Sequence, residues 1–170
     1  MQIQRRKSIR LKNYDYRQEG AYYITVCTFE KIEIFGHIMD GKMVLNDIGK
    51  IVYDEWKNTE KLRPNVLLDA FIVMPNHIHG IIIMNWSMSD DTIKNDVPNK
   101  FRSPSQTIGS IVRGFKSVST KRINIYRNSP SRYVWQRNFH DHIIRNEKDF
   151  NRIREYINNN PKQWDYDQYH

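Results

Sequence analysis

Two histidines that flank a single isoleucine, His77-Ile78-His79, constrain this chain more than any other feature of its sequence. They lie in the stretch MPNHIHG, where a proline–asparagine turn separates two apolar runs of strand length, residues 67–73 and 78–84. Because side chains alternate between the two faces of a strand, both imidazoles point the same way, with Cα atoms about 7 Å apart. Two neutral imidazoles on one rigid strand are half of a metal site.

The spacing alone does not decide between a metal site and a simpler arrangement. Two histidines at this spacing can be solvated polar residues opposite a core face of the sheet. The chain also contains a second such triplet, His140-Asp141-His142, so another feature of the chain must distinguish the two readings.

Length and cysteine usage bound the class of protein. A chain of 170 residues fits a single domain, 1–170, which can bury a core without disulfides. Cys27 is the only cysteine, so no disulfide framework is expected and a reducing cytoplasmic location fits. No secretory apolar segment and no run of 18 apolar residues is present, so we expect neither secretion nor a membrane partner.

The charge of the chain indicates a polyanionic partner. The formal net charge is +8 and the pI is near 9.6. Residues 99–132 contain eight lysines and arginines and no acidic residue, and residues 1–20 add six basic residues against two acidic ones. These two blocks favour nucleic acid as the partner over an ordinary solvated surface.

Hydrophobic periodicity and turn signals divide the chain into short elements. Asp40-Gly41 is a strong hairpin turn, and Asn46 and Asn146 are suited to cap helices. The predicted elements are a basic arm 1–14, a strand 21–29, a hairpin 32–38 and 42–45, a helix ended by Pro64, strands 67–73 and 78–84, a long loop 85–104, a basic amphipathic helix 105–126, one or two strands within 133–136 and 139–144, a final helix ended by Asn160-Pro161, and a tail 162–170.

Without the hairpin, this order is βαββαβ followed by a terminal helix. It predicts an α+β fold of the ferredoxin-like, or split βαβ, type: an antiparallel sheet with helices on one face and the C-terminal helix added. The other face is then available to a ligand, and the histidine pair lies on a central strand.

The final helix offers the missing parts of a reactive site. Tyr156 and Asn160 are one helical turn apart and are therefore neighbours in space. The asparagine carbonyl can complete a metal site with His77 and His79, with coordination positions left open as Mg²⁺ or Mn²⁺ keeps them. The tyrosine hydroxyl can attack a phosphorus atom, although an ordinary phenol pKa near 10 means that its proton needs help to leave.

Both residues also have ordinary interpretations. Tyr156 lies next to apolar helix positions and can be a core residue of an amphipathic helix. Asn160 precedes Pro161 and can be a plain helix stop. The residues by themselves leave these alternatives open.

Several motifs together resemble the REP-associated tyrosine transposases, a branch of the HUH single-tyrosine transposase superfamily. The resemblance covers nearly the whole chain except the loop 85–104 and the tail. The motifs that carry it are MPNHIHG (74–80), WQRNFHDHIIRNE (135–147), YINNNP (156–161), and at the start SIRL (8–11), YDY (14–16) and GAYY (20–23).

The resemblance implies a divalent metal on His77 and His79, with Asn160 as third ligand and Tyr156 as the nucleophile. The implied reaction is cleavage and rejoining of single-stranded DNA through a 5′-phosphotyrosine link. No acidic third ligand is evident in the sequence. The segment His140-Asp141-His142 falls where the resemblance implies a site-lining or structural role.

The implied DNA substrate is a hairpin-forming palindrome with a short single-stranded guide beside its stem. Phosphate contacts are expected from the basic arm and from the basic helix, and these contacts weaken with salt. Both a monomer and a homodimer remain open. The candidate DNA-binding residues are Arg5, Arg6, Arg10, Arg113, Lys116, Lys121 and Arg122.

Two further functions remain as alternatives. One is a non-catalytic, domesticated nucleic-acid-binding protein of the same fold, although the aromatic RNA-binding pattern of RRM domains is not found. The other is a metal phosphoesterase that uses water, with Tyr156 structural. A covalent protein–DNA adduct that depends on Tyr156 separates both from a transposase.

Overall fold

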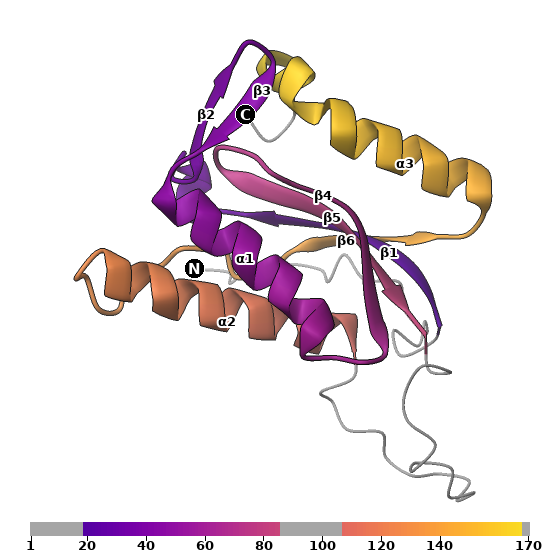
Figure 1. The fold of residues 1–170 in the computed structure, drawn as a ribbon, viewed down its shortest axis with the longest axis horizontal. Coiled ribbons are helices and arrows are strands. Elements are labelled where there is room, and N and C mark those ends of the chain that lie inside the picture. Colours follow the sequence, from indigo (N-terminus) through magenta and orange to yellow (C-terminus); the bar gives the residue numbers. More distant parts are fainter. Residues whose placement is uncertain (1–18, 86–106, 168–170) are drawn as a thin grey trace, which may run out of the picture.

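The computed structural model describes residues 19–85 and 107–167 (Figure 1). The basic arm 1–14, with Arg5, Arg6 and Arg10, and all but the first residue of the loop 85–104 lie outside the described residues. The elements in chain order are β1 (Gly20–Cys27), η1 (Phe29–Lys31), β2 (Gly36–Met39), β3 (Lys42–Leu45), α1 (Asp47–Lys61), β4 (Val66–Val73), β5 (His77–Met84), α2 (Ile108–Tyr126), β6 (His140–Ile144), α3 (Glu147–Asn159) and η5 (Asn160–Tyr166).

The main sheet is antiparallel and has four strands in the order β4-β5-β1-β6. The hairpin β2–β3 forms a separate two-stranded sheet, whose turn residues Asp40 and Gly41 both have positive φ, as a type I′ turn requires. Without that hairpin the order is βαββαβ, so the predicted α+β class is confirmed. β5 lies between β4 and β1, and the histidine pair is therefore on an inner strand.

Local capping signals set the helix starts. The Asn46 side chain accepts a hydrogen bond from Gly49 N at 2.9 Å, and the Asn146 side chain accepts one from Asp149 N at 2.9 Å. The predicted helix from residue 105 instead begins at Ile108, because Thr107 is its N-cap and forms a capping box with Ser110.

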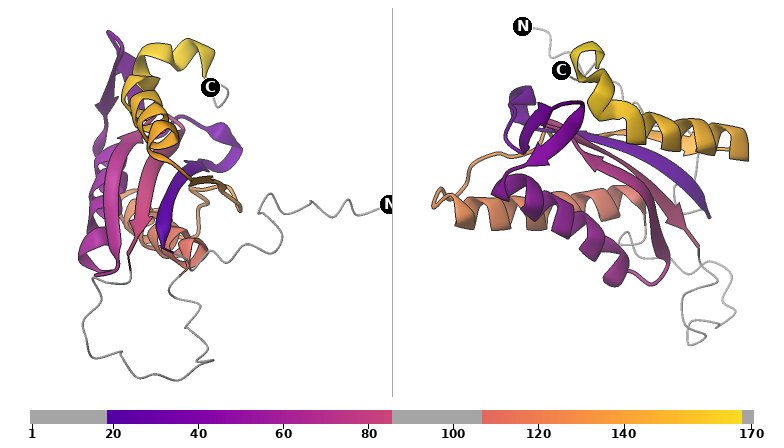
Figure 2. Two further views of the ribbon diagram at one scale, coloured as in Figure 1. Left: turned by 90° about the vertical axis from the view of Figure 1, so that its right-hand side faces the viewer. Right: turned by 45° about the horizontal axis from the view of Figure 1, so that its top comes forward.

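Helices cover both faces of the sheet. α1 and α2 pack together on one face, and α3 lies across the other, as the right-hand view of Figure 2 shows. The α3 residues Ile153 and Ile157 are buried against Ile81 and Ile144 of the sheet. This apolar stripe explains why α3 occupies part of the face that the sequence analysis left to a ligand.

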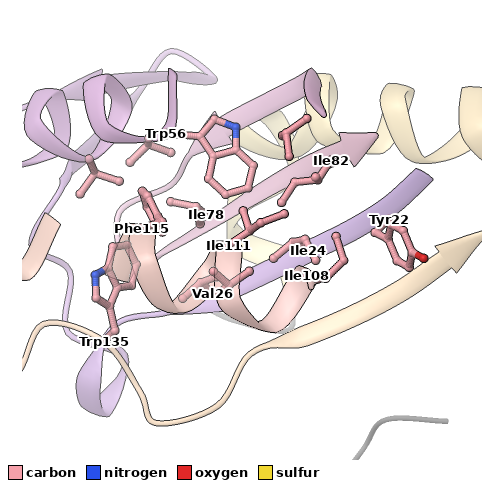
Figure 3. Close-up of a cluster of buried hydrophobic side chains, with 14 of the residues drawn as sticks. Tyr22, Ile24, Val26, Trp56, Ile78, Ile82, Ile108, Ile111, Phe115 and Trp135 are labelled. Carbon is pink, nitrogen blue, oxygen red and sulfur yellow. The ribbon is translucent and has the colours of Figure 1, made fainter. Parts of the chain in front are cut away.

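The larger core lies between the sheet and the α1–α2 layer (Figure 3). Alternate residues of β1 and β5 point into it, among them Ile24 and Ile78, and Trp56 of α1 fills its centre. The intervening residues of β5, including both histidines, therefore face α3. Among the described helices, none is long and apolar enough to cross a membrane.

Alanine at Gly80 is predicted to destabilise the fold because Trp56 occupies the space beside this glycine. A Cβ atom at Gly80 would lie 2.4 Å from Trp56 Cζ2. The indole cannot retreat easily, since it stacks on Phe71 with centroids 4.7 Å apart and meets Phe115 edge-on. We expect Gly80→Ala to lower the free energy of unfolding by about 1–3 kcal/mol, measured from the urea midpoint at unchanged m-value.

Gly114 provides the matched control. A Cβ atom there would meet only the end of the Arg63 side chain, at 3.3 Å, and the position lies inside α2. Gly114→Ala should stabilise the protein by about 0.5–1 kcal/mol because alanine loses less backbone entropy in a helix. Equal stability of Gly80→Ala and the wild type would show that Trp56 can move aside.

Candidate active site

β5 holds the histidine pair on one face, as the strand period predicts. His77 and His79 are both 0% exposed, and their Nε2 atoms lie 3.0 Å apart. Ile78 points to the opposite face and packs in the larger core. The two imidazoles thus meet at one point between the sheet and the C-terminal segment.

Hydrogen bonding determines the tautomer of His77, because the partner of its Nδ1 atom can only accept. Asn76 Nδ2 donates to the backbone carbonyl of Lys31 at 3.2 Å, which leaves Asn76 Oδ1 as the acceptor 2.7 Å from His77 Nδ1. His77 therefore carries its proton on Nδ1 and directs the Nε2 lone pair towards His79. This arrangement is typical of metal-binding histidines.

The Nδ1 atom of His79 can either donate or accept a hydrogen bond. Its Nδ1 lies 2.7 Å from the Tyr23 hydroxyl and 2.9 Å from the Thr25 hydroxyl, and a hydroxyl can donate or accept. With the proton on Nε2, His79 donates to His77. With the proton on Nδ1, both Nε2 lone pairs are available to a cation.

Burial keeps both imidazoles neutral near pH 7. Desolvation lowers the pKa of His77 to about 4; Lys31 lowers it further, while Asp167 acts in the opposite direction. Desolvation, followed by the neighbouring His77 and His140, lowers the pKa of His79 well below its ordinary value. Neutral imidazole is the form that binds a metal.

Asp167 is an acidic partner that the sequence analysis missed. Its carboxylate is buried, Oδ2 lies 3.9 Å from His77 Nε2, and the ligand atoms of His77, His79 and Asp167 all lie within 4.8 Å of one another. η5 brings it there, since Trp164 is buried and stacks on His77 with centroids 6.0 Å apart. The segment treated as a tail from residue 162 is thus folded as far as Asp167; its only sequence signal was the tryptophan.

Asn160 lies beside this cluster and fits a cation. Its Nδ2 donates to Asp167 Oδ2 at 2.8 Å, and reversing the amide would turn its oxygen towards the carboxylate. Within residues 19–85 and 107–167, the buried Asn160 Oδ1 has no hydrogen-bond partner. A buried oxygen without a partner, on an amide that bonds the carboxylate of a cluster with two imidazoles, adds a donor suited to a divalent metal.

Tyr156 lies next to the histidine pair. Its half-buried ring is 5.4 Å from the His79 ring and 6.3 Å from the Tyr23 ring, measured between centroids. Ile153 and Ile157 anchor α3 on the sheet, which fixes the side of the helix that Tyr156 presents. The structure therefore brings together four residues predicted from the sequence: His77, His79, Tyr156 and Asn160.

Comparison with known proteins finds relatives that match nearly the whole chain. No protein-family model matches the chain. An uncharacterized protein of Haemophilus influenzae is 46% identical over 173 residues, which cover 98% of this chain and 93% of that protein. A second Haemophilus influenzae protein, provisionally named as a REP-associated tyrosine transposase, is 25% identical over 171 residues, or 94% of this chain and 86% of that protein.

Solved structures share the fold. A REP-associated tyrosine transposase bound to a REP hairpin has a TM-score of 0.61 at 19% identity, over 94% of this chain and 77% of that one. The chain is thus similar in sequence to one protein provisionally named as a REP-associated tyrosine transposase and shares its fold with a solved one. A provisionally named transposase from Deinococcus radiodurans R1 has a TM-score of 0.50 at 15% identity, over 89% of this chain and 97% of that one.

The second histidine triplet lies at the start of β6, at the edge of the sheet. His140 lies close enough to lower the pKa of His79. His142 is exposed and lies 2.9 Å from the Asp149 carboxylate, which joins β6 to the start of α3. Asp141 is opposite Ile24 in the strand register and therefore belongs to the other face of the sheet from the histidine pair.

The basic helix α2 lies on the face away from the histidine pair. Arg113 and Lys121 are exposed, whereas Arg122 forms an ion pair with Glu55 of α1. Lys116 donates to the backbone carbonyls of Gln136 and Arg137, and burial lowers its pKa to about 8. Two of the four candidate DNA-binding residues on this helix thus also make contacts that stabilise the fold.

An ion pair ties the tyrosine helix to the sheet. Arg154 Nε and Nη2 donate to the two carboxylate oxygens of Asp69 at 2.8 and 2.7 Å. The register of β4 against β5 shifts between Leu68 and Phe71, so the strand is irregular where Asp69 lies. Such irregularities re-aim side chains, and Asp69 here meets Arg154 of α3, two residues before Tyr156. No sequence pattern indicated this ion pair.

Proposed function

We propose that the protein cleaves and rejoins single-stranded DNA through a covalent bond to Tyr156. The observation that carries the proposal is the position of the Tyr156 ring, 5.4 Å from His79, beside the cluster of His77, His79 and Asp167. A phenol next to a buried group of metal ligands is suited to attack a phosphodiester whose charge the site stabilises. The similarity to a provisionally named REP-associated tyrosine transposase supports the same reaction class.

The cleavage step exchanges one phosphoester bond for another. Tyr156 Oη forms a bond to phosphorus and loses its proton to solvent, the bond from phosphorus to the 3′ oxygen breaks, and that oxygen takes up a proton. The product is a 5′-phosphotyrosine and a free 3′ hydroxyl. Because the number of phosphoester bonds is unchanged, a 3′ hydroxyl can reverse the step and rejoin a strand.

His77, His79 and Asp167 would hold a divalent metal, with Asn160 Oδ1 as a fourth donor. Such an ion polarises a phosphoryl oxygen and neutralises charge that develops there. Two imidazoles favour Mn²⁺ over Mg²⁺, which prefers oxygen ligands. The chain itself supplies orientation, since Asn76 and the Tyr23 hydroxyl hold the rings of His77 and His79 in place.

The proposed substrate is a DNA hairpin with a single-stranded extension. The basic charge of the chain and its relationship to a transposase solved with a REP hairpin support this choice. The test incubates the protein with labelled hairpins from the DNA that flanks its own gene, with Mn²⁺ or with EDTA. A slowly migrating protein–DNA species on a denaturing gel, present only with metal, supports the proposal; cleavage without such a species contradicts it and indicates a hydrolase.

DNA binding without cleavage is the second candidate. Trp164 and Asp167 lie against His77, whose side chain is fully buried, so a DNA strand can reach the pair only if this segment moves. Hairpin binding with neither cleavage nor adduct, with Mn²⁺ present, would favour this function.

The Asp69–Arg154 pair is predicted to position Tyr156. Asp69→Ala should slow adduct formation about 10- to 100-fold, because small displacements of a reacting group are costly in rate. The free energy of unfolding should change by less than about 1 kcal/mol, since the pair is partly exposed. The measurement is the single-turnover rate of adduct formation.

Lys50→Ala is the control for loss of a surface ion pair. Lys50 bonds Asp47 at 3.0 Å on α1, in the layer on the opposite face of the sheet from α3. The Lys50→Ala variant should form the adduct at the wild-type rate. A wild-type rate in Asp69→Ala as well would show that Ile153 and Ile157 alone set the position of the helix.

A further inference from the structure

Two aromatic side chains form a stacked pair on the surface. Phe29 is 39% exposed and Tyr133 is 76% exposed, and their ring centroids lie 5.5 Å apart at an interplanar angle of 30°. We call these two residues the aromatic pair. Neither residue belongs to either hydrophobic core cluster, so the pair does not serve to fill the interior. Single exposed apolar residues are common, but two that stack on each other call for an explanation.

Backbone hydrogen bonds place the aromatic pair at the end of β5 where the histidine pair begins. Phe29 N donates to the Val134 carbonyl at 2.9 Å, which aligns the two aromatic residues. Thr28 N donates to the Asn76 carbonyl at 2.8 Å, and Cys27 is opposite His77 in the strand register. Phe29 is thus two residues beyond the position that faces the first histidine.

A side-chain connection reinforces this placement. Asn76 accepts the proton of His77 Nδ1 and donates to the backbone carbonyl of Lys31, the last residue of the η1 turn that begins at Phe29. One asparagine therefore couples the orientation of a histidine in the pair to the turn that carries the aromatic pair.

Both loops that carry the aromatic pair contain uncommon backbone conformations. Glu30 and Lys31 follow Phe29 with φ of 55° and 57°, and Ser131, two residues before Tyr133, has φ of 68°. Non-glycine residues adopt such angles at a cost and cluster at binding sites, where the surrounding structure enforces them.

Positive charge accompanies the rings. Arg132 is exposed and precedes Tyr133, Lys31 is exposed two residues after Phe29, and Arg137 is exposed further along the second loop. The first loop also exposes Glu30 and Glu33, whereas residues 127–139 contain no acidic residue. Aromatic faces flanked by cations are how proteins bind single-stranded nucleic acid, because bases stack on the rings and phosphates meet the cations.

We propose that Phe29 and Tyr133 form a base-stacking subsite for single-stranded DNA next to the histidine pair. The subsite rests on the proposed function, since it would hold a nucleotide of the strand that Tyr156 cleaves. Stacking tolerates any base, so the subsite fixes the path of the strand rather than its sequence.

The test measures equilibrium affinity of the full chain for two probes in EDTA, where no cleavage occurs. One probe is a DNA hairpin with an oligothymidine extension, and the other is the same hairpin with a blunt end. Phe29→Ala and Tyr133→Ala should each weaken binding of the extended probe about 5- to 150-fold and leave the blunt probe unchanged. Phe29→Trp and Tyr133→Phe should keep the wild-type affinity, which shows that ring stacking and not folding is responsible.

Tyr53→Ala is the matched control. Tyr53 is 43% exposed and also contacts another ring, that of Phe71, but it lies on α1 in the opposite layer. It should bind both probes as the wild type does. Unchanged affinity of the alanine variants for the extended probe, or equal losses on both probes, would overturn the subsite. If wild-type protein forms no protein–DNA adduct in the presence of Mn²⁺, the proposed chemistry is refuted. The binding test is independent of that result, because it is done in EDTA without cleavage.

Discussion

A Tyr156→Phe variant is expected to bind hairpin DNA normally and to form no covalent adduct. The substitution removes only the hydroxyl, while the ring remains beside His79 and Tyr23. Removal of a nucleophile typically lowers the rate of the chemical step by several orders of magnitude, so adduct formation should fall at least about a thousandfold. The free energy of unfolding should change by no more than about 1.5 kcal/mol, the contribution of one hydrogen bond.

Tyr23→Phe is the most informative comparison, because Tyr23 is the other tyrosine beside His79. Its hydroxyl lies 2.7 Å from His79 Nδ1, so its loss should loosen a metal ligand and slow the reaction about 10- to 100-fold. Adduct should still form. Loss of adduct in Tyr23→Phe together with retention in Tyr156→Phe would transfer the nucleophile to Tyr23 and overturn the assignment.

The second large effect is expected at the metal. His77→Ala should abolish Mn²⁺ binding measured by titration calorimetry, together with the rise in melting temperature that a bound ligand produces. Asp167→Asn should weaken Mn²⁺ at least about tenfold, since it removes the only charged ligand of the cluster. Asn160→Ala tests the alternative: if it abolishes Mn²⁺ binding and Asp167→Asn does not, the sequence-based ligand set is the correct one.

The pH dependence of Mn²⁺ binding follows from the His77 pKa of about 4. Protons compete with the metal for the Nε2 lone pair, so a lowered pKa means that competition begins only at lower pH. Affinity should stay nearly constant as pH falls from 8 to 6 and should decline towards pH 4. A decline centred near 6.5, the ordinary histidine value, would show that the pair is solvated in solution.

The sequence was sufficient for features that depend on neighbours along the chain. The alternation of a strand predicted that His77 and His79 share a face, with Ile78 opposite. The helical period predicted that Ile153 and Ile157 form one buried stripe on α3. Capping chemistry predicted the helix that starts after Asn146, and its N-cap hydrogen bond confirms this start.

Other features could not be predicted from the sequence because they depend on contacts between residues far apart in the chain. The Asp69–Arg154 pair joins residues far apart in the chain. It also depends on an irregularity of β4 that no glycine or proline in the sequence indicates. The side of the sheet on which α2 packs could not be predicted either. Its basic residues are evident in the sequence, but the helix packs on the face away from the histidine pair.

The amino-acid sequence by itself determined the α+β fold, the histidine pair on an inner strand and the tyrosine on the last helix, because periods of 2.0 and 3.6 residues are local properties. Only the tertiary structure decided that Asp167 joins the pair. The segment after Pro161 has no periodic pattern, and its path depends on the burial of Trp164 against His77. A ligand delivered by such a segment becomes visible only when the whole chain is packed.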